Sequence, residues 1–204
     1  MKPVSSRLMV VDASVARDCG QRTTPPVPHC LRILETILKV CHRAALSDEL
    51  KLEWDRHGKK SRNFMRWWKS MTNRRKIVRQ DLRRLEELKG RLIRVANKQL
   101  HGLLEKDAHL VAAALEGNAV LLSRDEKLRS HLEKLAHRIQ GLGDVLWVNP
   151  SRDLDTALEW LESGAPDGPE HRIGYQRDTA PTRTETHKRR AKPSRRRSPS
   201  TPRR

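Results

Sequence analysis

The sequence lacks the patterns that mark several large classes of protein. It has 3 cysteines, an odd number with no C-x-x-C pair, which argues against a disulfide-stapled fold. No stretch approaches the roughly 18 apolar residues of a membrane span. The apolar run in the opening MKPVSSRLMVVDAS is too short for a signal peptide. Together these three absences predict a cytoplasmic protein without membrane contact. The sequence also has neither a G-x-G-x-x-G nor a Walker A motif, so it gives no support to a nucleotide cofactor.

Aromatic residues are also scarce, whereas positive charge is abundant. Only 3% of the residues are aromatic, and most of these are tryptophans. Lys and Arg total 43 against 25 Asp and Glu, which gives a formal net charge of +18. Such an excess of one sign predicts a polyanionic partner, with nucleic acid as the first choice.

Part of this charge is concentrated at the C-terminal end. Residues 165–204 carry about eight positive charges in excess, and the stretch THKRRAKPSRRRSPSTPRR contains no acid and no large apolar residue. A segment of this composition cannot bury enough apolar surface to offset the entropy lost on ordering. It is therefore predicted to be a disordered basic tail, which follows a folded domain over residues 1–164. Its role as a substrate guide, a cellular address or a source of charge stays open.

The folded part alternates short apolar runs with stretches of helical periodicity. Strands are expected over 7–12, 43–47, 119–123 and 144–148, and helices over 31–41, 47–54, 106–118, 126–139 and 152–163. This alternation predicts an α/β fold in which right-handed crossovers build a central parallel sheet between helical layers, a three-layer sandwich.

A basic helical insert is expected over about 59–100. A break near Thr72 and Asn73 suggests two helices that form an antiparallel hairpin. Phe64, Trp67 and Trp68 alternate with cations, a pattern that suits base stacking beside phosphate contacts. The candidate nucleic-acid-binding residues are Arg62, Arg66, Trp67, Arg74, Arg75 and Lys76. Three other interpretations stay open: a solvated helical face, a hairpin packed by its own tryptophans, and a surface for a protein partner.

Acidic residues occur where the expected strands end. Asp12 closes the first strand in VVDAS, and Asp125 follows the AVLLS strand. Asp107 opens a helix and shares its apolar stripe with Leu110, so it should face the sheet. Because the carboxyl ends of parallel strands meet at one edge, these three aspartates should lie together there, with Glu53 alongside.

Clustered carboxylates repel one another unless a cation neutralises them. Hard oxygen ligands without nearby Cys or His suit Mg²⁺ or Mn²⁺ rather than zinc. Beside a wide basic surface, such an ion would serve phosphodiester hydrolysis by polarising the phosphoryl oxygen and activating a water. No triad-like arrangement of Ser, His or Cys competes with this interpretation.

The strings VVDAS, LKLEW and KDAHLVAAALEGNAVLLSRDEKL, in this order, resemble the PIN domain, the nuclease fold of VapC-type toxins and many RNA-processing proteins. The resemblance covers about residues 7–150. It implies that Asp12, Glu53, Asp107 and Asp125 are the catalytic and metal-binding acids, and that Ser14 and Ser123 support them. It further implies a Mg²⁺- or Mn²⁺-dependent endoribonuclease acting on single-stranded or structured RNA. An antitoxin or other protein partner and a homodimer are expectations from the same family.

The chain also departs from the family pattern. Many members carry an acid two residues after the position of Asp125, where this chain has Lys127 with Glu126 beside it. Occupancy by one or two metals therefore stays open, as does the choice between Glu53 and Glu49 as the fourth acid. The alternative function is a catalytically weak or inactive PIN-like protein that binds nucleic acid. The RNA target also stays open.

Overall fold

The computed structural model describes residues 6–20, 28–152 and 154–175. Within these ranges five strands form one sheet: β1 (Leu8–Val11), β2 (Arg43–Leu46), β3 (Ile77–Arg79), β4 (Val120–Leu122) and β5 (Leu146–Val148). All neighbouring strands are parallel, and their order is β3-β2-β1-β4-β5. The predicted α/β fold with a central parallel sheet is confirmed.

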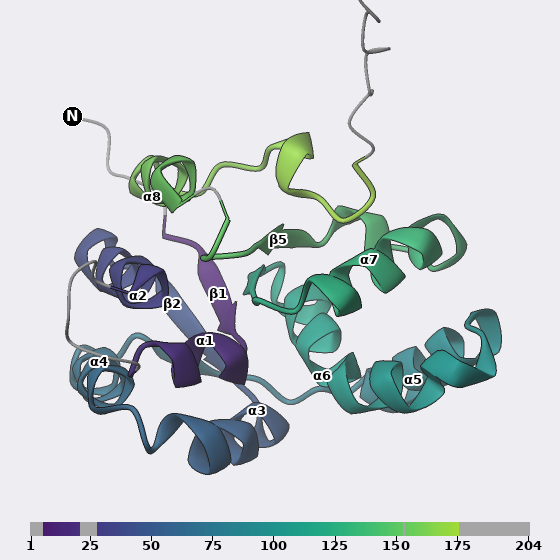
Figure 1. The fold of residues 1–204 in the computed structure, drawn as a ribbon, viewed down its shortest axis with the longest axis horizontal. Helices are drawn as coiled ribbons and strands as arrows, with labels where there is room; N and C mark the ends of the chain where they lie inside the picture. The colour runs from purple at the N-terminus through teal and green to yellow at the C-terminus, as the bar shows by residue number, and fades with distance from the viewer. Residues whose placement is uncertain (1–5, 21–27, 153, 176–204) are drawn as a thin grey trace, which may run out of the picture.

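The described helices cover the two faces of this sheet, which is consistent with a three-layer sandwich (Figure 1). One layer holds α1 (Ala13–Asp18), α2 (His29–Val40), α3 (Asp48–Glu53), α4 (Arg62–Asn73) and α8 (Leu154–Glu162), and the other holds α5 (Leu85–Val95), α6 (His101–Gly117) and α7 (Glu126–Leu135). None of the helices in the described ranges is long and apolar enough to cross a membrane.

The core lies on both faces of the central strands. All four residues of β1 and all three of β4 are buried, as expected for parallel strands that are covered by helices on each side. Residues 110–114 of α6 are buried in succession, because three alanines let this helix lie close to its neighbours. Burial on both faces therefore fixes the positions of β1 and β4, and with them the positions of the residues that follow these strands.

The expected helical hairpin over 59–100 is wrong. A short strand, β3, separates α4 from α5 and pairs with β2 at the edge of the sheet. The two helices pack on different neighbours, α4 on α2 and α5 on α6, in opposite layers of the molecule (Figure 1). Arg75 with φ 53° turns the chain from α4 into β3. A half-buried edge strand of three residues carries too little periodicity to be separated from the basic helices around it.

The folded part extends beyond Gly164. Ile173 is 1% exposed, and its backbone N–H donates a hydrogen bond to the carbonyl of Val145 at 2.9 Å. Arg172 forms an antiparallel bridge with Leu146. Residues 165–175, which the composition assigned to the tail, thus pack along the edge strand β5. Residues 176–204, the rest of the predicted tail, lie outside the described residues.

Candidate functional site

The four predicted acids line one small cavity at the carboxyl edge of the sheet. Its volume is about 170 Å³, and its lining includes Asp12, Glu53, Asp107 and Asp125. The acids come from four different elements: the end of β1, α3, α6 and the start of α7. Successive acids are 18 to 54 residues apart along the chain, so the parallel sheet brings them together.

Asp12 is held by two serines. Its backbone N–H donates to the carbonyl of Leu122, so the end of β1 lies beside the end of β4. Its Oδ2 accepts hydrogen bonds from Ser14 Oγ at 2.6 Å and from Ser123 Oγ at 2.5 Å, and its Oδ1 accepts one from the Ser14 N–H. Asp12 is also the N-cap of α1. The carboxylate therefore has a single well-defined orientation.

The same serines position the segment that carries Asp125. Ser123 Oγ accepts the N–H of Asp125 at 3.1 Å, and Ser14 Oγ accepts the N–H of Arg124 at 3.2 Å. Asp125 Oδ1 accepts the N–H of Leu128 at 2.8 Å and caps α7. Each serine thus joins Asp12 to the loop after β4.

Glu53 is fixed from two sides. The next residue, Trp54, donates its indole N–H to the carbonyl of Val11 at 2.7 Å, which ties the end of α3 to the residue before Asp12. Oε2 of Glu53 lies 3.5 Å from Nε2 of the buried His109. Burial opposes a charge on each of the two groups, but their mutual attraction outweighs it. The pKa of Glu53 is therefore lowered and the pKa of His109 is raised.

Asp107 is the least satisfied of the four acids. It is 8% exposed, and among the described residues its carboxylate accepts no hydrogen bond. Burial is the main cause that raises its pKa to about 6. The charge of Lys106 opposes this shift, whereas the charges of Asp12 and Glu53 add to it. A positive ion in the cavity would favour the charged form of Asp107.

The chemistry of the donors suits a hard cation, although their present positions do not close around one. No group of three His, Cys, Asp or Glu side chains within the described ranges is arranged to hold a metal ion. Oxygens without a hydrogen bond from the described residues nevertheless remain on Asp107, on Asp125 and on Glu53. Such carboxylate oxygens are the ligands that Mg²⁺ and Mn²⁺ take in proteins.

The neighbouring acids lie outside the cavity. Glu53 lines it and Glu49 does not. Glu126 accepts hydrogen bonds from Asn149 and Arg152, and Lys127 is exposed. Neither Glu49 nor Glu126 therefore adds a fifth carboxylate to the lining of the cavity.

The predicted nucleic-acid-binding residues do not form one surface around these acids. Trp67 is 3% exposed and packs in the core, so its ring is not open to a base. Arg62 and Arg66 are exposed on α4. Arg74, Arg75 and Lys76 precede β3, at the amino edge of the sheet and thus opposite to the acids. The Nζ of Lys76 donates to the carbonyl of Cys41.

Sequence reasoning missed several residues at the cavity. Its lining also includes Arg17, His57 and Lys106, and His109 supports Glu53 from behind. His109 lies in a helix segment that is apolar on nearly all sides. A single histidine in such a segment predicts a buried polar partner only weakly. Nothing in the sequence around Arg17 separates it from the many other arginines.

A comparison of this chain with protein families, with curated proteins and with solved structures finds no match. The interpretation of the site therefore depends on its own geometry.

Proposed function

We propose that this chain is a PIN-like endoribonuclease that uses Mg²⁺ or Mn²⁺ to hydrolyse phosphodiester bonds in single-stranded or structured RNA. The observation that carries the proposal is the convergence of four carboxylates from four elements in one cavity of about 170 Å³, in a chain whose net charge is +18. Carboxylates gathered in one cavity repel one another and raise each other's pKa, so they destabilise the fold unless a cation binds there. A purely structural purpose does not account for such a cluster.

The residues have distinct parts in this proposal. Asp107, Asp125 and Glu53 offer free oxygens to the ion, while Asp12, held by Ser14 and Ser123, offers a fixed carboxylate at the end of β1. When bound, a divalent ion polarises the phosphoryl oxygen and lowers the pKa of an attacking water. His109 holds Glu53 in its charged form and orients it. Lys106 and Arg17 at the rim reduce the repulsion between the acids and an RNA phosphate.

The direct test is cleavage of a labelled single-stranded RNA by the purified full chain in the presence of Mn²⁺ or Mg²⁺. Asp107→Asn and Asp125→Asn should each lower the rate by at least about a hundredfold, since each removes a charge from the ion's ligands. Glu49→Gln is the matched control, because it removes one nearby negative charge outside the cavity. Equal cleavage by all four proteins would contradict the proposal and point to a contaminating nuclease.

A second candidate function is nucleic-acid binding without catalysis. It is favoured by the fact that no three potential ligands within the described part of the chain are arranged to hold an ion. Thermal melting separates the two functions. If the carboxylates bind a metal ion, the protein should have a higher melting temperature in Mn²⁺ than in EDTA. This increase in melting temperature should vanish in Asp107→Asn but persist in Glu49→Gln. RNA binding with no metal-dependent gain would support the binding protein.

A further inference from the structure

A second, entirely basic pocket adjoins the acidic cavity. Its volume is about 270 Å³, and among the described residues it is lined by Arg17, Gly20, Arg56, His57 and Lys60. Arg17 and His57 line both pockets, so the two are direct neighbours. One lining is rich in carboxylates and the other contains none. The boundary between them is therefore a sharp change in the sign of charge.

The fold brings these cations together through a close contact between two helices. The chain leaves α3 in a π-helix over Trp54–Gly58, which carries Arg56 and His57. This π-helix packs against α1, which carries Arg17. Gly58 lets the end of this π-helix lie close to α4, because a Cβ at this position would lie 2.8 Å from the ring of Phe64.

The cations of this pocket have few acidic partners. Lys51 and Lys59, on neighbouring turns, both pair with Asp55. Within the described ranges no such ion pair forms at Arg56, His57 or Lys60, and all three side chains are exposed. Arg17 contacts Asp18, whose carboxylate also pairs with Arg124. The pocket thus retains a net positive charge after the neighbouring acids are counted.

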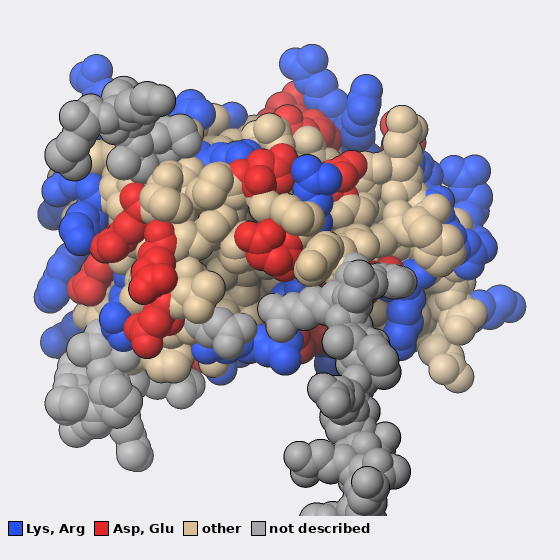
Figure 2. Space-filling view, turned by 90° about the horizontal axis from the view of Figure 1, so that it is seen from above, with Lys and Arg blue, Asp and Glu red and all other residues tan. Residues whose placement is uncertain are grey.

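On the side of the molecule that carries α8, acidic residues lie among the cations. Figure 2, which views the molecule from the side of α8 and the terminal segment, shows patches of Asp and Glu between the blue cations. The acids on that side include Asp155, Glu159 and Glu162 of α8. The carboxyl edge of the sheet lies at the other end of the strands from α8 (Figure 1). The basic pocket adjoins the acidic cavity at that edge.

We infer that the pocket of Arg17, Arg56, His57 and Lys60 binds a backbone phosphate of single-stranded RNA, next to the phosphodiester that enters the acidic cavity. This inference rests on the proposed function, and it names the part of the chain that holds the substrate. Contacts to phosphates position a nucleic acid without reading its sequence. The pocket therefore sets where the strand crosses the acids, while the choice of sequence must come from elsewhere.

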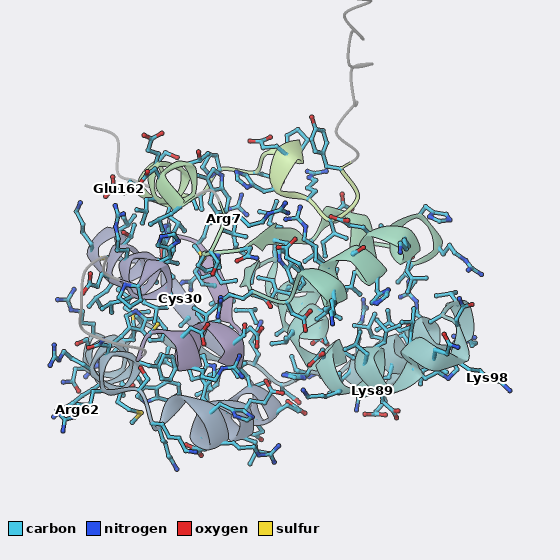
Figure 3. All side chains as sticks on the ribbon, in the orientation of Figure 1. Arg7, Cys30, Arg62, Lys89, Lys98 and Glu162 are labelled. Carbon is cyan, nitrogen blue, oxygen red and sulfur yellow. The ribbon has the colours of Figure 1, made fainter. Side chains whose placement is uncertain are left out.

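The test measures binding of a fluorescent single-stranded RNA to the full chain in EDTA, over a series of salt concentrations. The double variant Arg56→Gln/Lys60→Gln should bind about tenfold more weakly at low salt, and the slope of log K against log salt should become shallower by about 0.7 for each lost phosphate contact. Arg94→Gln/Lys98→Gln is the matched control, because it removes two exposed cations at the far end of the molecule, where Lys98 lies in Figure 3.

The outcomes are separable from those of the nuclease assay. A larger loss of affinity and slope in Arg56→Gln/Lys60→Gln than in the control supports the pocket, even if no cleavage is ever seen. Equal losses in both variants overturn it, because binding would then follow total charge alone. A loss confined to Arg62→Gln/Arg66→Gln also overturns it and moves the RNA to α4, the helix on which Arg62 is labelled in Figure 3. Circular dichroism confirms that each variant is folded.

Discussion

Ser123 Oγ lies 2.5 Å from Oδ2 of Asp12, and this hydrogen bond joins residues that are 111 positions apart in the chain. The same hydroxyl accepts the N–H of Asp125 at 3.1 Å. Ser123 is fully buried at the end of β4, and Asp12 follows β1 next to it in the sheet. One hydroxyl group therefore sets the distance between two of the four acids.

Replacing this serine should destabilise the protein. Ser123→Ala removes one of the two hydroxyl groups that donate to Oδ2 of Asp12 and leaves the Asp125 N–H without its acceptor, which should lower the free energy of unfolding by about 1–3 kcal/mol. Ser14→Ala is the matched comparison, since Ser14 also makes two hydrogen bonds with this loop and carboxylate but is partly exposed, so water can replace its hydroxyl. Urea unfolding measures both. A larger loss in Ser14→Ala would show that the buried hydroxyl is not the main link.

Asp107→Asn should stabilise the protein at neutral pH. Burial, as the main cause, raises the pKa of Asp107 to about 6, whereas the unfolded chain has its ordinary value near 3.8. Between these values the folded state holds more protons than the unfolded state, so this residue makes stability fall as pH rises through that window. An asparagine removes the cost of the buried charge, and the free energy of unfolding at pH 7 should rise by about 1–3 kcal/mol.

The gain should depend on pH. At about pH 4 the wild-type carboxyl is already neutral in the folded protein, so Asp107→Asn should change the free energy of unfolding little. Urea unfolding of both proteins at the two pH values, in EDTA, gives the comparison. Glu49→Gln, which alters an acid outside the cavity, controls for the change in net charge. A gain of the same size at both pH values would show that desolvation of the charge is not its cause.

Much of the fold and of the acidic cluster could be predicted because the signals are local. The apolar runs of β1 and β4 each end at a polar residue, and parallel strands bring such ends to one edge. Asp107 shares the buried stripe of α6 with Leu110 and Val111, which placed it toward the sheet. These relations depend only on strand and helix periodicity, so a single sequence contains them.

Other features depend on contacts that no local pattern encodes. The strand β3 forms by pairing with β2 through Ile77 and Val78, although the neighbouring residues in the chain are basic. The partnership of His109 with Glu53, and the proximity of Arg17 to Arg56, arise from the packing of separate helices. The sequence contains many other Lys and Arg residues, and composition does not show which of them lack an acidic ion-pair partner in the folded protein.

Trp67 should matter for stability rather than for RNA binding. Its ring centroid lies 5.6 Å from that of Phe64 and 6.2 Å from that of Trp54. All three side chains are buried. Trp67→Ala should lower the free energy of unfolding by about 3–5 kcal/mol through the cavity it leaves. Arg66→Gln, on the exposed side of the same helix, should leave stability nearly unchanged. If Trp67→Ala instead stays stable and loses RNA affinity, the indole is a binding group after all.

The segment over 165–175 should contribute to stability through Ile173. This side chain is 1% exposed beside β5, whereas Tyr175 is 42% exposed two residues later. Ile173→Ala should lower the free energy of unfolding by about 2–5 kcal/mol, because it removes buried methyl groups and leaves a cavity. Tyr175→Ala, at an exposed position of the same segment, should change it by about 0.5 kcal/mol or less. Equal, small effects of the two substitutions in urea unfolding would mean that the segment does not stabilise the sheet, and that the domain ends near Gly164. A large effect of Ile173→Ala alone places the end of the domain after this residue.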